Sequence, residues 1–508
     1  MVHGDWLGSW ARTVPDKPAL IDLATRGGEV ITYLELSRRA VRAANLLRDL
    51  GVGPGDRVAV LGENRPEQVE LYFAAAGLGA VLVPVNWRLT PDEVAYILRD
   101  SAPRAVFFGD DVLATVRALP GAGWGGERIG FDDRYPALVS ASSPDPVATE
   151  GITDDTPVML LYTSGTTGRP KGAVLTHGSV TWNAINTATS WDLHHADVTL
   201  THTPFFHTGG WNVLTLPLLH RGGTVALARR FDAGETVEAI DRYGVTVLFA
   251  VPTMFQMMLD EPALARARLS TVRFFISGGA PCPIPLIEAF QRRGVVFKQG
   301  YGLTEVGPNC FVLNEKDAVR KAGSVGHPVL HLDTRVVTVE GQPVSPGEVG
   351  ELQLRGPTVC AGYWRNPDAS AAARTADGWF RTGDLFRIDD EGYHTVVGRL
   401  KEMFISGGEN VYPAEVERVL YQLPGVVEAA VVGVPHEKWG EVGHAFVAFA
   451  AGDPVVRTEE VLDHCRRHLA RYKVPKAVTV LGSLPKGSSG KIDKLALGRL
   501  ARGEDTQS

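Results

Sequence analysis

One stretch of the chain combines several hydroxyls, three glycines and two cations, and it reads Tyr162-Thr163-Ser164-Gly165-Thr166-Thr167-Gly168-Arg169-Pro170-Lys171-Gly172. It follows the apolar run Val158-Met159-Leu160-Leu161, which is typical of a buried strand. Glycine permits positive φ angles and a close backbone approach, and successive N–H groups form a nest for anions. The stretch therefore predicts a loop after a strand that binds the phosphates of a nucleotide.

Two better-known phosphate loops do not match this stretch. A Walker A loop requires Gly, four further residues, and then Gly-Lys followed by Ser or Thr. Here Pro170 stands five positions after Gly165, and Gly172 follows Lys171. The stretch also lacks the GxGxxG spacing of dinucleotide-binding folds. A flexible surface loop is the plain alternative, and the buried strand directly before the stretch argues against it.

Composition limits the class of protein. The chain has 508 residues, 44% of them hydrophobic and 21% charged, which is typical of a globular protein with more than one domain. A net charge of −7 argues against binding to nucleic acid. The four cysteines are scattered without a CxxC pair, which argues against a disulfide framework or a cysteine metal site. We see neither a transmembrane segment nor a signal peptide, so we expect a cytoplasmic protein.

The first part of the chain alternates strand-like and helix-like segments. Strands are expected at 57–61, 81–83, 106–108, 245–249, 273–276 and 295–297, with helices starting at Pro66 and at Pro91, the second capped by Thr90. Such alternation predicts parallel strands with crossover helices. After a break near 398–401, a smaller α+β unit is expected, with a helix from Pro413, strands at 426–434 and 444–449, and a helix around 461–469.

Five short motifs, in order, resemble those of the adenylate-forming superfamily, which includes acyl-CoA synthetases, luciferases and adenylation domains of peptide synthetases. Besides the opening stretch, they are Tyr301-Gly302-Leu303-Thr304-Glu305, Thr382-Gly383-Asp384, Gly398-Arg399-Leu400-Lys401 and Ser489-Gly490-Lys491. The resemblance implies a large α/β N-terminal domain, residues 1–399, with parallel-sheet subdomains and a β-rich part. It also implies a small mobile α+β C-terminal domain, residues 400–508.

The resemblance further implies a two-step acid–thiol ligase. A carboxylic acid attacks the α-phosphorus of ATP, which gives acyl-AMP and pyrophosphate, and the thiol of coenzyme A then displaces AMP. The implied partners are a small-molecule acid, ATP and coenzyme A, with Mg²⁺ as the metal. A homodimer is compatible with the resemblance, although no sequence feature specifies the oligomeric state.

The resemblance assigns the nucleotide site residue by residue. The residues expected to bind ATP or AMP are Thr163, Ser164, Gly165, Thr166, Thr167, Gly168, Lys171, Gly279, Ala280, Pro281, Gly300, Tyr301, Gly302, Asp384 and Arg399. Asp384 is expected to accept hydrogen bonds from the ribose hydroxyls. Glu305, with Thr163 nearby, is the expected metal ligand, because Mg²⁺ is usually held by one or two carboxylates and phosphate oxygens.

The resemblance also implies the catalytic residues, which are Lys491, His207, Thr304 and Glu305. Lys491 would bridge the attacking carboxylate and the α-phosphate, and Thr304 would bind the α-phosphate. Lys401 matches the hinge about which the small domain turns between the two steps. Three residues would then line the channel for the pantetheine arm of coenzyme A: Ser406, Gly407 and Gly408.

The acyl pocket is expected at the segment Pro204-Phe205-Phe206-His207-Thr208-Gly209-Gly210-Trp211. It would include Phe206, His207, Trp211 and Gly302, with His207 bordering the carboxylate. A packed core histidine is the alternative interpretation of His207. The aromatic residues and the lack of clustered arginines favour a hydrophobic acid, but they do not separate fatty, aryl and polycyclic acids.

Two other functions remain open. One is a relative that performs only adenylation or only thioesterification. The other is an acyl-AMP ligase that loads a carrier protein. Fatty acyl-AMP ligases of that second type carry an insertion in the large domain, and the 80 positions between Thr304 and Asp384 leave no obvious room for one.

Overall fold

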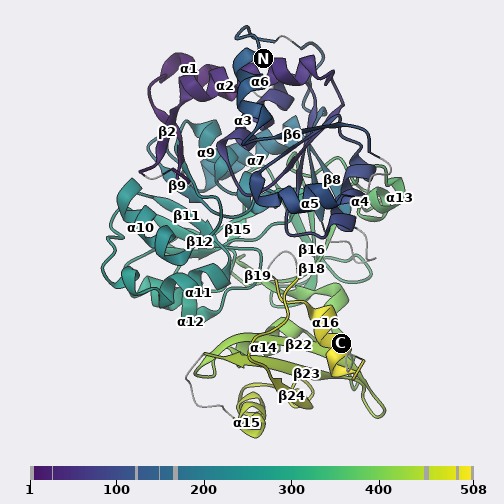
Figure 1. The fold of residues 1–508 in the computed structure, drawn as a ribbon. Helices are drawn as coiled ribbons and strands as arrows, with labels where there is room; N and C mark the ends of the chain where they lie inside the picture. Colours follow the sequence, from purple (N-terminus) through teal and green to yellow (C-terminus); the bar gives the residue numbers. More distant parts are fainter. Residues whose placement is uncertain are drawn as a thin grey trace.

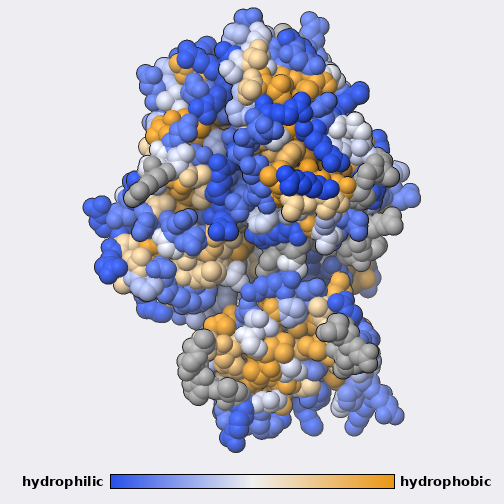
Figure 2. All heavy atoms as spheres, in the orientation of Figure 1, coloured by the Kyte–Doolittle hydropathy of each residue, from blue (hydrophilic) through white to orange (hydrophobic). Residues whose placement is uncertain are grey.

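A computed structural model describes residues 5–25, 27–119, 124–147, 149–163, 170–450, 457–487 and 491–504. Figure 1 shows a large body that holds the first four-fifths or so of the chain and a smaller body, green to yellow, below it. In the space-filling view of Figure 2, the outline narrows where the two bodies meet. Within the described ranges, no helix is both long and apolar enough to cross a membrane.

The two strands that flank the expected phosphate loop belong to a six-stranded sheet with the order β6-β5-β3-β4-β7-β8. The strands are β3 (Arg57–Leu61), β4 (Val81–Val85), β5 (Ala105–Phe108), β6 (Glu127–Gly130), β7 (Pro157–Thr163) and β8 (Lys171–Thr176). Strands β3 to β7 pair in parallel, and β7 pairs with β8 antiparallel. The parallel strands predicted from the sequence are thus confirmed here.

A second, seven-stranded sheet has the order β13-β12-β11-β9-β10-β1-β2. Its strands are β1 (Pro18–Asp22), β2 (Glu29–Thr32), β9 (Val198–Thr201), β10 (Thr224–Leu227), β11 (Val247–Ala250), β12 (Phe274–Ser277) and β13 (Phe297–Gln299). All neighbours pair in parallel except β1 and β2. The carboxyl ends of parallel strands are where open α/β sheets bind ligands.

Helices alternate with the strands of the large body, as the sequence pattern predicts. They are α1 (Trp6–Thr13), α2 (Tyr33–Asp49), α3 (Pro66–Gly77), α4 (Pro91–Ser101), α5 (Leu113–Ala118), α6 (Arg134–Ala141), α7 (His177–Ser190), α8 (Thr208–Asn212), α9 (Thr215–Arg221), α10 (Ala233–Tyr243), α11 (Pro252–Asp260), α12 (Ile284–Gln291) and α13 (Pro367–Ala372). Short 3₁₀ turns are η1 (Asp110–Val112), η2 (Pro262–Ala265), η3 (Thr304–Val306) and η4 (Glu315–Asp317).

Two of these helices illustrate what the pattern did and did not reveal. Helix α4 starts as expected, because Thr90 and Glu93 form a reciprocal capping box. Helix α3 is buried on nearly all sides, including Gln68 and Glu70, because it packs against α2 as well as against β4. The start signal at Pro66 therefore predicted where α3 begins and not how deeply the helix is buried.

An antiparallel part completes the large body. Strands β16 (Asp333–Val337), β17 (Val349–Arg355), β18 (Phe380–Ile388) and β19 (His394–Arg399) form a four-stranded sheet, and β14 (Phe311–Val312) pairs with β15 (His327–Pro328). This is the β-rich part of the expected fold class, which the structure confirms. Strand β19 ends at Arg399, and the 3₁₀ turn η5 (Leu400–Glu402) follows.

The small body is a five-stranded sheet with helices. Its strands are β20 (Phe404–Ser406), β21 (Glu409–Val411), β22 (Val426–His436), β23 (Gly440–Phe449) and β24 (Ala477–Val480), and its helices are α14 (Pro413–Leu420), α15 (Thr458–His468) and α16 (Lys494–Ala501). Both helices and both strands predicted here are present. Figure 2 shows hydrophobic residues over the sheet of this body.

Candidate active site

The two ends of the expected phosphate loop lie side by side. Thr163, the last residue of β7, pairs with Lys171, the first residue of β8. The expected loop residues Ser164, Gly165, Thr166, Thr167 and Gly168 lie outside the described residues. Lys171 points its ammonium at the ring of Tyr363, with Nζ 5.5 Å from the ring centroid. A cation therefore stands at the base of the loop, where phosphate oxygens would be bound.

Glu305, the expected metal ligand, lies next to Thr163, the last residue of β7. Its Oε1 accepts a hydrogen bond from the hydroxyl of Tyr363 at 3.0 Å and lies 3.5 Å from Oγ1 of Thr163. The side chain is buried in η3, and its backbone carbonyl accepts from the amide of Cys360 at 2.7 Å. Among the described residues, no three His, Cys, Asp or Glu side chains converge to hold a metal. One buried carboxylate with a nearby hydroxyl fits Mg²⁺, which takes oxygen ligands and keeps several waters.

Asp384, Tyr301 and Arg399 form the second part of the site. Oδ1 of Asp384 lies 3.0 Å from Nε of Arg399, and Oδ2 accepts a hydrogen bond from the hydroxyl of Tyr301 at 2.6 Å. Burial raises the pKa of Asp384, an effect that Arg399 and Tyr301 only partly offset. A buried carboxylate of this kind gains stability from further donors such as ribose hydroxyls.

Small residues lie between these two parts of the site, and we call Gly279, Ala280, Pro281, Gly300 and Gly302 the floor. Gly279, Ala280 and Pro281 are exposed directly after the carboxyl end of β12. Gly279 has a φ of +81°, which favours glycine. At Gly302 an added Cβ would lie 2.2 Å from the carbonyl of Pro308, so only glycine fits. Gly300 follows β13, at the same edge of the sheet. This edge offers backbone without side chains to a planar ligand.

Lys491 comes from the small body and reaches this floor. Its Cε lies 4.0 Å from the position of a Cβ on Gly279. Lys491 is still exposed to solvent in part. Desolvation by the neighbouring protein and the positive charge of Arg399 lower the pKa of its ammonium. Asp384 acts in the opposite direction and favours the charged ammonium. The structure thus brings together Lys491, Gly279, Asp384 and Arg399 from two bodies.

His207 also faces Lys491. Burial lowers the pKa of His207 to about 4, with further contributions from the charges of Lys491 and Arg88. Its Nε2 is buried without a hydrogen-bond partner among the described residues. A neutral imidazole with a free nitrogen is suited to bind a carboxylate or a carbonyl next to Lys491. We call residues 203–210 the gate segment, because they carry His207 into helix α8.

Aromatic rings pack around the gate segment. The Phe206 ring lies 4.5 Å from His207 and 6.2 Å from Trp87, and the guanidinium of Arg88 stands 5.7 Å from it. No sequence pattern predicted an arginine here, because Arg88 follows β4 and lies far from the gate segment in the chain. Trp211 is fully buried and stacks on Phe205 at 4.1 Å.

Phe249 is a site residue that sequence reasoning did not single out. Its ring lies 3.0 Å from the position of a Cβ on Gly209 and 3.2 Å from one on Gly278. It therefore separates the gate segment from the floor beside Gly279. Its position at the carboxyl end of β11 is the feature that could have identified it as a site residue, because ligands bind at this edge of a parallel sheet. Tyr363, which holds Glu305, was also missed, since no pattern links it to the motifs.

Buried amides support the site from behind. Asn183 of α7 donates to the carbonyl of Asn212 at 2.7 Å, and Asn309 donates to the same carbonyl at 3.1 Å. A pocket with room for one water molecule lies among Asn212, Thr304 and Thr358. Within the described chain, Oδ1 of Asn212 and Oγ1 of Thr358 have no protein partner, which suits a bridging water. The amides thus join α8 to the loop of Thr304.

The expected channel residues lie in the hairpin between β20 and β21. Gly407 and Gly408 have φ angles of +62° and +90°, as a two-residue type I′ turn requires. The glycines therefore have a structural role whether or not they line a channel. Ser406 is buried, and Gly407 donates its amide to the carbonyl of Trp439 at 2.9 Å. The hairpin thus packs within the small body.

Two family models match the chain. The AMP-binding enzyme model matches residues 7–364, and the model of the AMP-binding enzyme C-terminal domain matches residues 415–491. The chain belongs to the AMP-binding enzyme family. Feruloyl-CoA synthase from an Amycolatopsis species is 44% identical over 496 residues, 96% of this chain and 97% of that protein. Indoleacetate–CoA ligase from Aromatoleum aromaticum is 40% identical over 500 residues, 97% of each.

The adenylate-forming superfamily predicted from the motifs is therefore confirmed, and the relatives support ATP-dependent ligation of an acid to coenzyme A. Among solved structures, ATP-bound MatB from Rhodopseudomonas palustris has a TM-score of 0.90 at 32% identity over 99% of each chain. The apo form of MatB gives 0.79 over the same coverage. The overall structure of this chain is thus more similar to the ATP-bound form of MatB than to its apo form.

Proposed function

We propose that this AMP-binding enzyme converts a hydrophobic carboxylic acid to acyl-AMP and pyrophosphate and then to its acyl-CoA and AMP. The observation that carries the proposal is the position of Lys491. A lysine of the small body stands beside Gly279, Arg399 and His207 of the large body. A cation at this place can neutralise the two anions that must meet in the first step, the acid and the α-phosphate.

The first step uses the residues at the floor. The carboxylate oxygen forms a bond to the α-phosphorus while the bond to the leaving pyrophosphate breaks. Lys491 holds the carboxylate against the α-phosphate, and Lys171 faces the departing phosphates. Asp384 and Tyr301 orient the ribose. Glu305 and Thr163 would hold Mg²⁺, which, when bound, supplies positive charge to the phosphate oxygens.

The second step needs a path for the thiol to the acyl-adenylate, and in this arrangement Lys491 stands beside Gly279. We propose that the small body turns about Leu400 and Lys401. Arg399 is tied to Asp384 of the large body at 3.0 Å, while Glu402 is tied to Lys494 of α16 at 2.9 Å. The two residues between these ion pairs are therefore the natural pivot. After rotation, Ser406, Gly407 and Gly408 would line the channel for the pantetheine arm.

The acid proposed for testing is an aryl acid. The Phe249 ring lies between Gly209 and Gly278, and the Phe206 ring lies 4.5 Å from His207, so aromatic side chains are close to His207. The two relatives described above are named for feruloyl and indoleacetyl products, which both derive from aryl acids. Cinnamic-type and arylacetic acids are therefore expected to be better substrates than saturated fatty acids.

The proposal is tested by separating the two steps. ATP–pyrophosphate exchange reports adenylation, and consumption of coenzyme A reports thioesterification, each across a panel of aryl, fatty and dicarboxylic acids. We expect both activities with the same aryl acids. Exchange without coenzyme A consumption would instead favour the half-reaction enzyme, and transfer only to a carrier-protein thiol would favour the acyl-AMP ligase. Absence of exchange with every acid would refute the proposal.

A further inference from the structure

Asn64 connects the carboxyl ends of the two parallel sheets. It follows β3 and is 1% exposed. Its Nδ2 donates to the carbonyl of Thr203 at 3.0 Å and to that of Ala228 at 3.3 Å, and its Oδ1 accepts from the amide of Phe205 at 2.8 Å. Both amide hydrogens and the carbonyl oxygen of this side chain are thus bonded, all to residues of the other sheet's loops.

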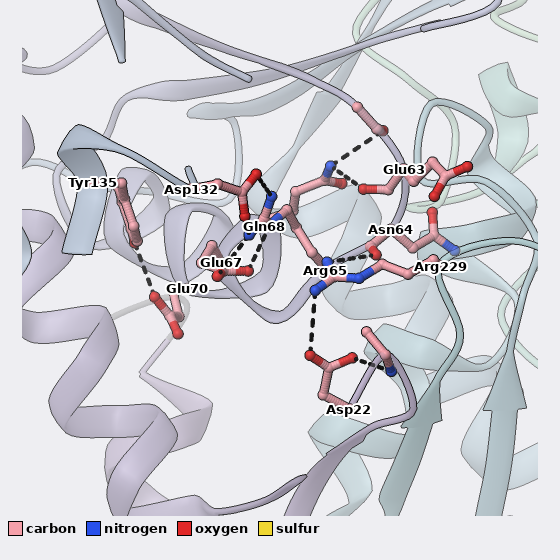
Figure 3. Close-up of polar contacts among 12 residues, drawn as sticks. Asp22, Glu63, Asn64, Arg65, Glu67, Gln68, Glu70, Asp132, Tyr135 and Arg229 are labelled. Carbon is pink, nitrogen blue, oxygen red and sulfur yellow. Dashed lines mark hydrogen bonds and ion pairs between the residues drawn. The ribbon is translucent and has the colours of Figure 1, made fainter. Parts of the chain in front are cut away.

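The backbone of Asn64 is held as firmly as its side chain. Its amide donates to the carbonyl of Arg229 at 3.2 Å, and its own carbonyl accepts from Nη1 of Arg229 at 3.1 Å. Arg229 in turn lies 3.4 Å from Asp22 of β1. Figure 3 shows Arg229 between Asn64 and Asp22. The residue is therefore tied to the seven-stranded sheet from two sides.

The next residue fixes the loop in the opposite direction. Arg65 is 7% exposed and forms a two-pronged pair with Asp132, at 2.9 and 2.8 Å, together with a contact to Glu67 at 2.9 Å. Figure 3 shows these carboxylates on the far side of Arg65 from Asn64. Paired and buried ions of this kind hold a single geometry. The ion pairs of Arg65 thus hold the loop in one position, with Asn64 against the gate segment.

The gate segment joins these contacts to His207 through a closely packed turn. The amide of His207 donates to the carbonyl of Pro204 at 3.0 Å. A Cβ on Gly210 would lie 2.5 Å from that same carbonyl oxygen and 2.7 Å from the carbonyl oxygen of Thr203. The turn is therefore closely packed, and the two positions that Asn64 holds, Thr203 and Phe205, stand four and two residues before His207.

We propose that Asn64 is a positioning residue for acid binding, which acts by fixing Thr203 and Phe205 and thereby the place of His207. The inference rests on the proposed function, because His207 is taken to face the carboxylate. Asn64 does not reach the nucleotide residues through these contacts. Its loss should therefore weaken acid binding selectively, while the binding of ATP is retained.

The experiment compares Asn64→Ala with Gln68→Ala in the full-length chain. Gln68 is equally buried and donates to the carbonyls of Gly62 and Glu63 in the same loop, so it serves as a matched control for lost stability. In ATP–pyrophosphate exchange, we expect Asn64→Ala to raise KM for the acid about tenfold and to change KM for ATP less than about twofold, the scale of one or two lost hydrogen bonds. Gln68→Ala should lower Tm similarly and leave both KM values near wild type.

Equal KM values for the acid in Asn64→Ala and Gln68→Ala would overturn the inference. Hydrogen exchange of the Phe205 amide gives a second readout that needs no activity. The exchange should be faster in Asn64→Ala than in Gln68→Ala, and equal rates would contradict the role.

If Asn64→Ala does not fold, the Asn64→Asp variant tests the inference instead, because it keeps the acceptor for the amide of Phe205 and loses the donor to the carbonyl of Thr203. It should show an intermediate KM for the acid, and a wild-type KM would overturn the inference. A wild-type enzyme without exchange would refute the proposed function separately.

Discussion

Asp384 and Arg399 stand directly opposite each other on β18 and β19, with Nε of Arg399 3.0 Å from Oδ1 of Asp384. Arg399 is the last residue of β19, immediately before the turn that leads to the small body. One ion pair therefore lies both at the proposed ribose site and at the edge of the proposed pivot. We therefore expect this pair to couple nucleotide binding to the position of the small body.

Replacing Asp384 with Asn tests the ribose site. The variant keeps the size of the side chain but loses the charge that Arg399 faces and the strong acceptor for ribose hydroxyls. We expect KM for ATP to rise about 10- to 100-fold, the effect of losing charge-assisted hydrogen bonds, while KM for the acid changes little. Steady-state kinetics of pyrophosphate exchange measure both constants. A larger effect on the acid than on ATP would contradict the assignment.

Replacing Lys491 with Ala should remove the cation that joins the acid to the α-phosphate. We expect adenylation to fall by about 10²- to 10³-fold or more, the cost of deleting one preorganised charge. Thioesterification of a supplied acyl-adenylate should remain, because that step starts after the phosphate bond has formed. Lys494→Ala is a poor control because it breaks the pair with Glu402 beside the proposed pivot, whereas Lys486→Ala breaks a pair with Glu428 that lies within the small body. Normal pyrophosphate exchange in Lys491→Ala would disprove its role.

Replacing Lys401 with Pro tests the pivot between Arg399 and Glu402. Proline is tolerated in the first turn of a helix, so the present arrangement should persist, but the fixed φ angle prevents rotation at this residue. We expect adenylation within a few-fold of wild type and thioesterification reduced by about tenfold or more. Lys401→Ala removes the same charge without fixing φ and should leave both steps active. Equal loss of both steps in Lys401→Pro would exclude a pivot at this position.

Replacing Phe249 with Leu tests the wall of the acyl pocket. The change removes the ring that lies against Gly209 and Gly278 while keeping an apolar side chain. We expect the ratio of kcat/KM between bulky and small aryl acids to rise about tenfold, which is the usual scale for small changes in an apolar pocket. KM for ATP should not change. If the acid preference stays the same, Phe249 does not line the pocket.

Glu70 predicts a pH dependence of stability unrelated to catalysis. Burial, together with Glu67, raises its pKa from an ordinary 4.5 to about 7, although Tyr135 donates a hydrogen bond to it. Because the folded pKa is the higher one, the contribution of Glu70 to stability is complete below pH 4.5 and is lost as the pH rises through about 7. Glu70→Gln should be more stable than wild type at pH 8 by about 2–3 kcal/mol relative to their difference at pH 5. Urea unfolding of both proteins at both pH values measures this difference. The same difference in free energy of unfolding at pH 5 and at pH 8 would show that Glu70 is not held neutral.

Much of the fold was accessible from local patterns. The alternation of apolar runs with capped helices predicted the parallel strands, and Thr90 marked the start of α4 correctly. The motifs around Glu305, Asp384 and Lys491 identified the superfamily, which the family models confirm. These features are visible in sequence because turn geometry, capping and backbone approach to phosphates depend on residues that are neighbours in the chain.

Other features depend on strand order, which no local pattern specifies. Phe249 reaches Gly209 and Gly278 only because β11 lies between β9 and β12, and Asn64 reaches Phe205 only because the two sheets place their carboxyl ends together. Arg88 stands over Phe206 for the same reason. The chain's own sequence thus determined which chemical groups are present and where each strand ends in a ligand-binding loop. The tertiary structure alone decided which of these groups meet, because contacts between distant segments follow from how sheets and domains pack.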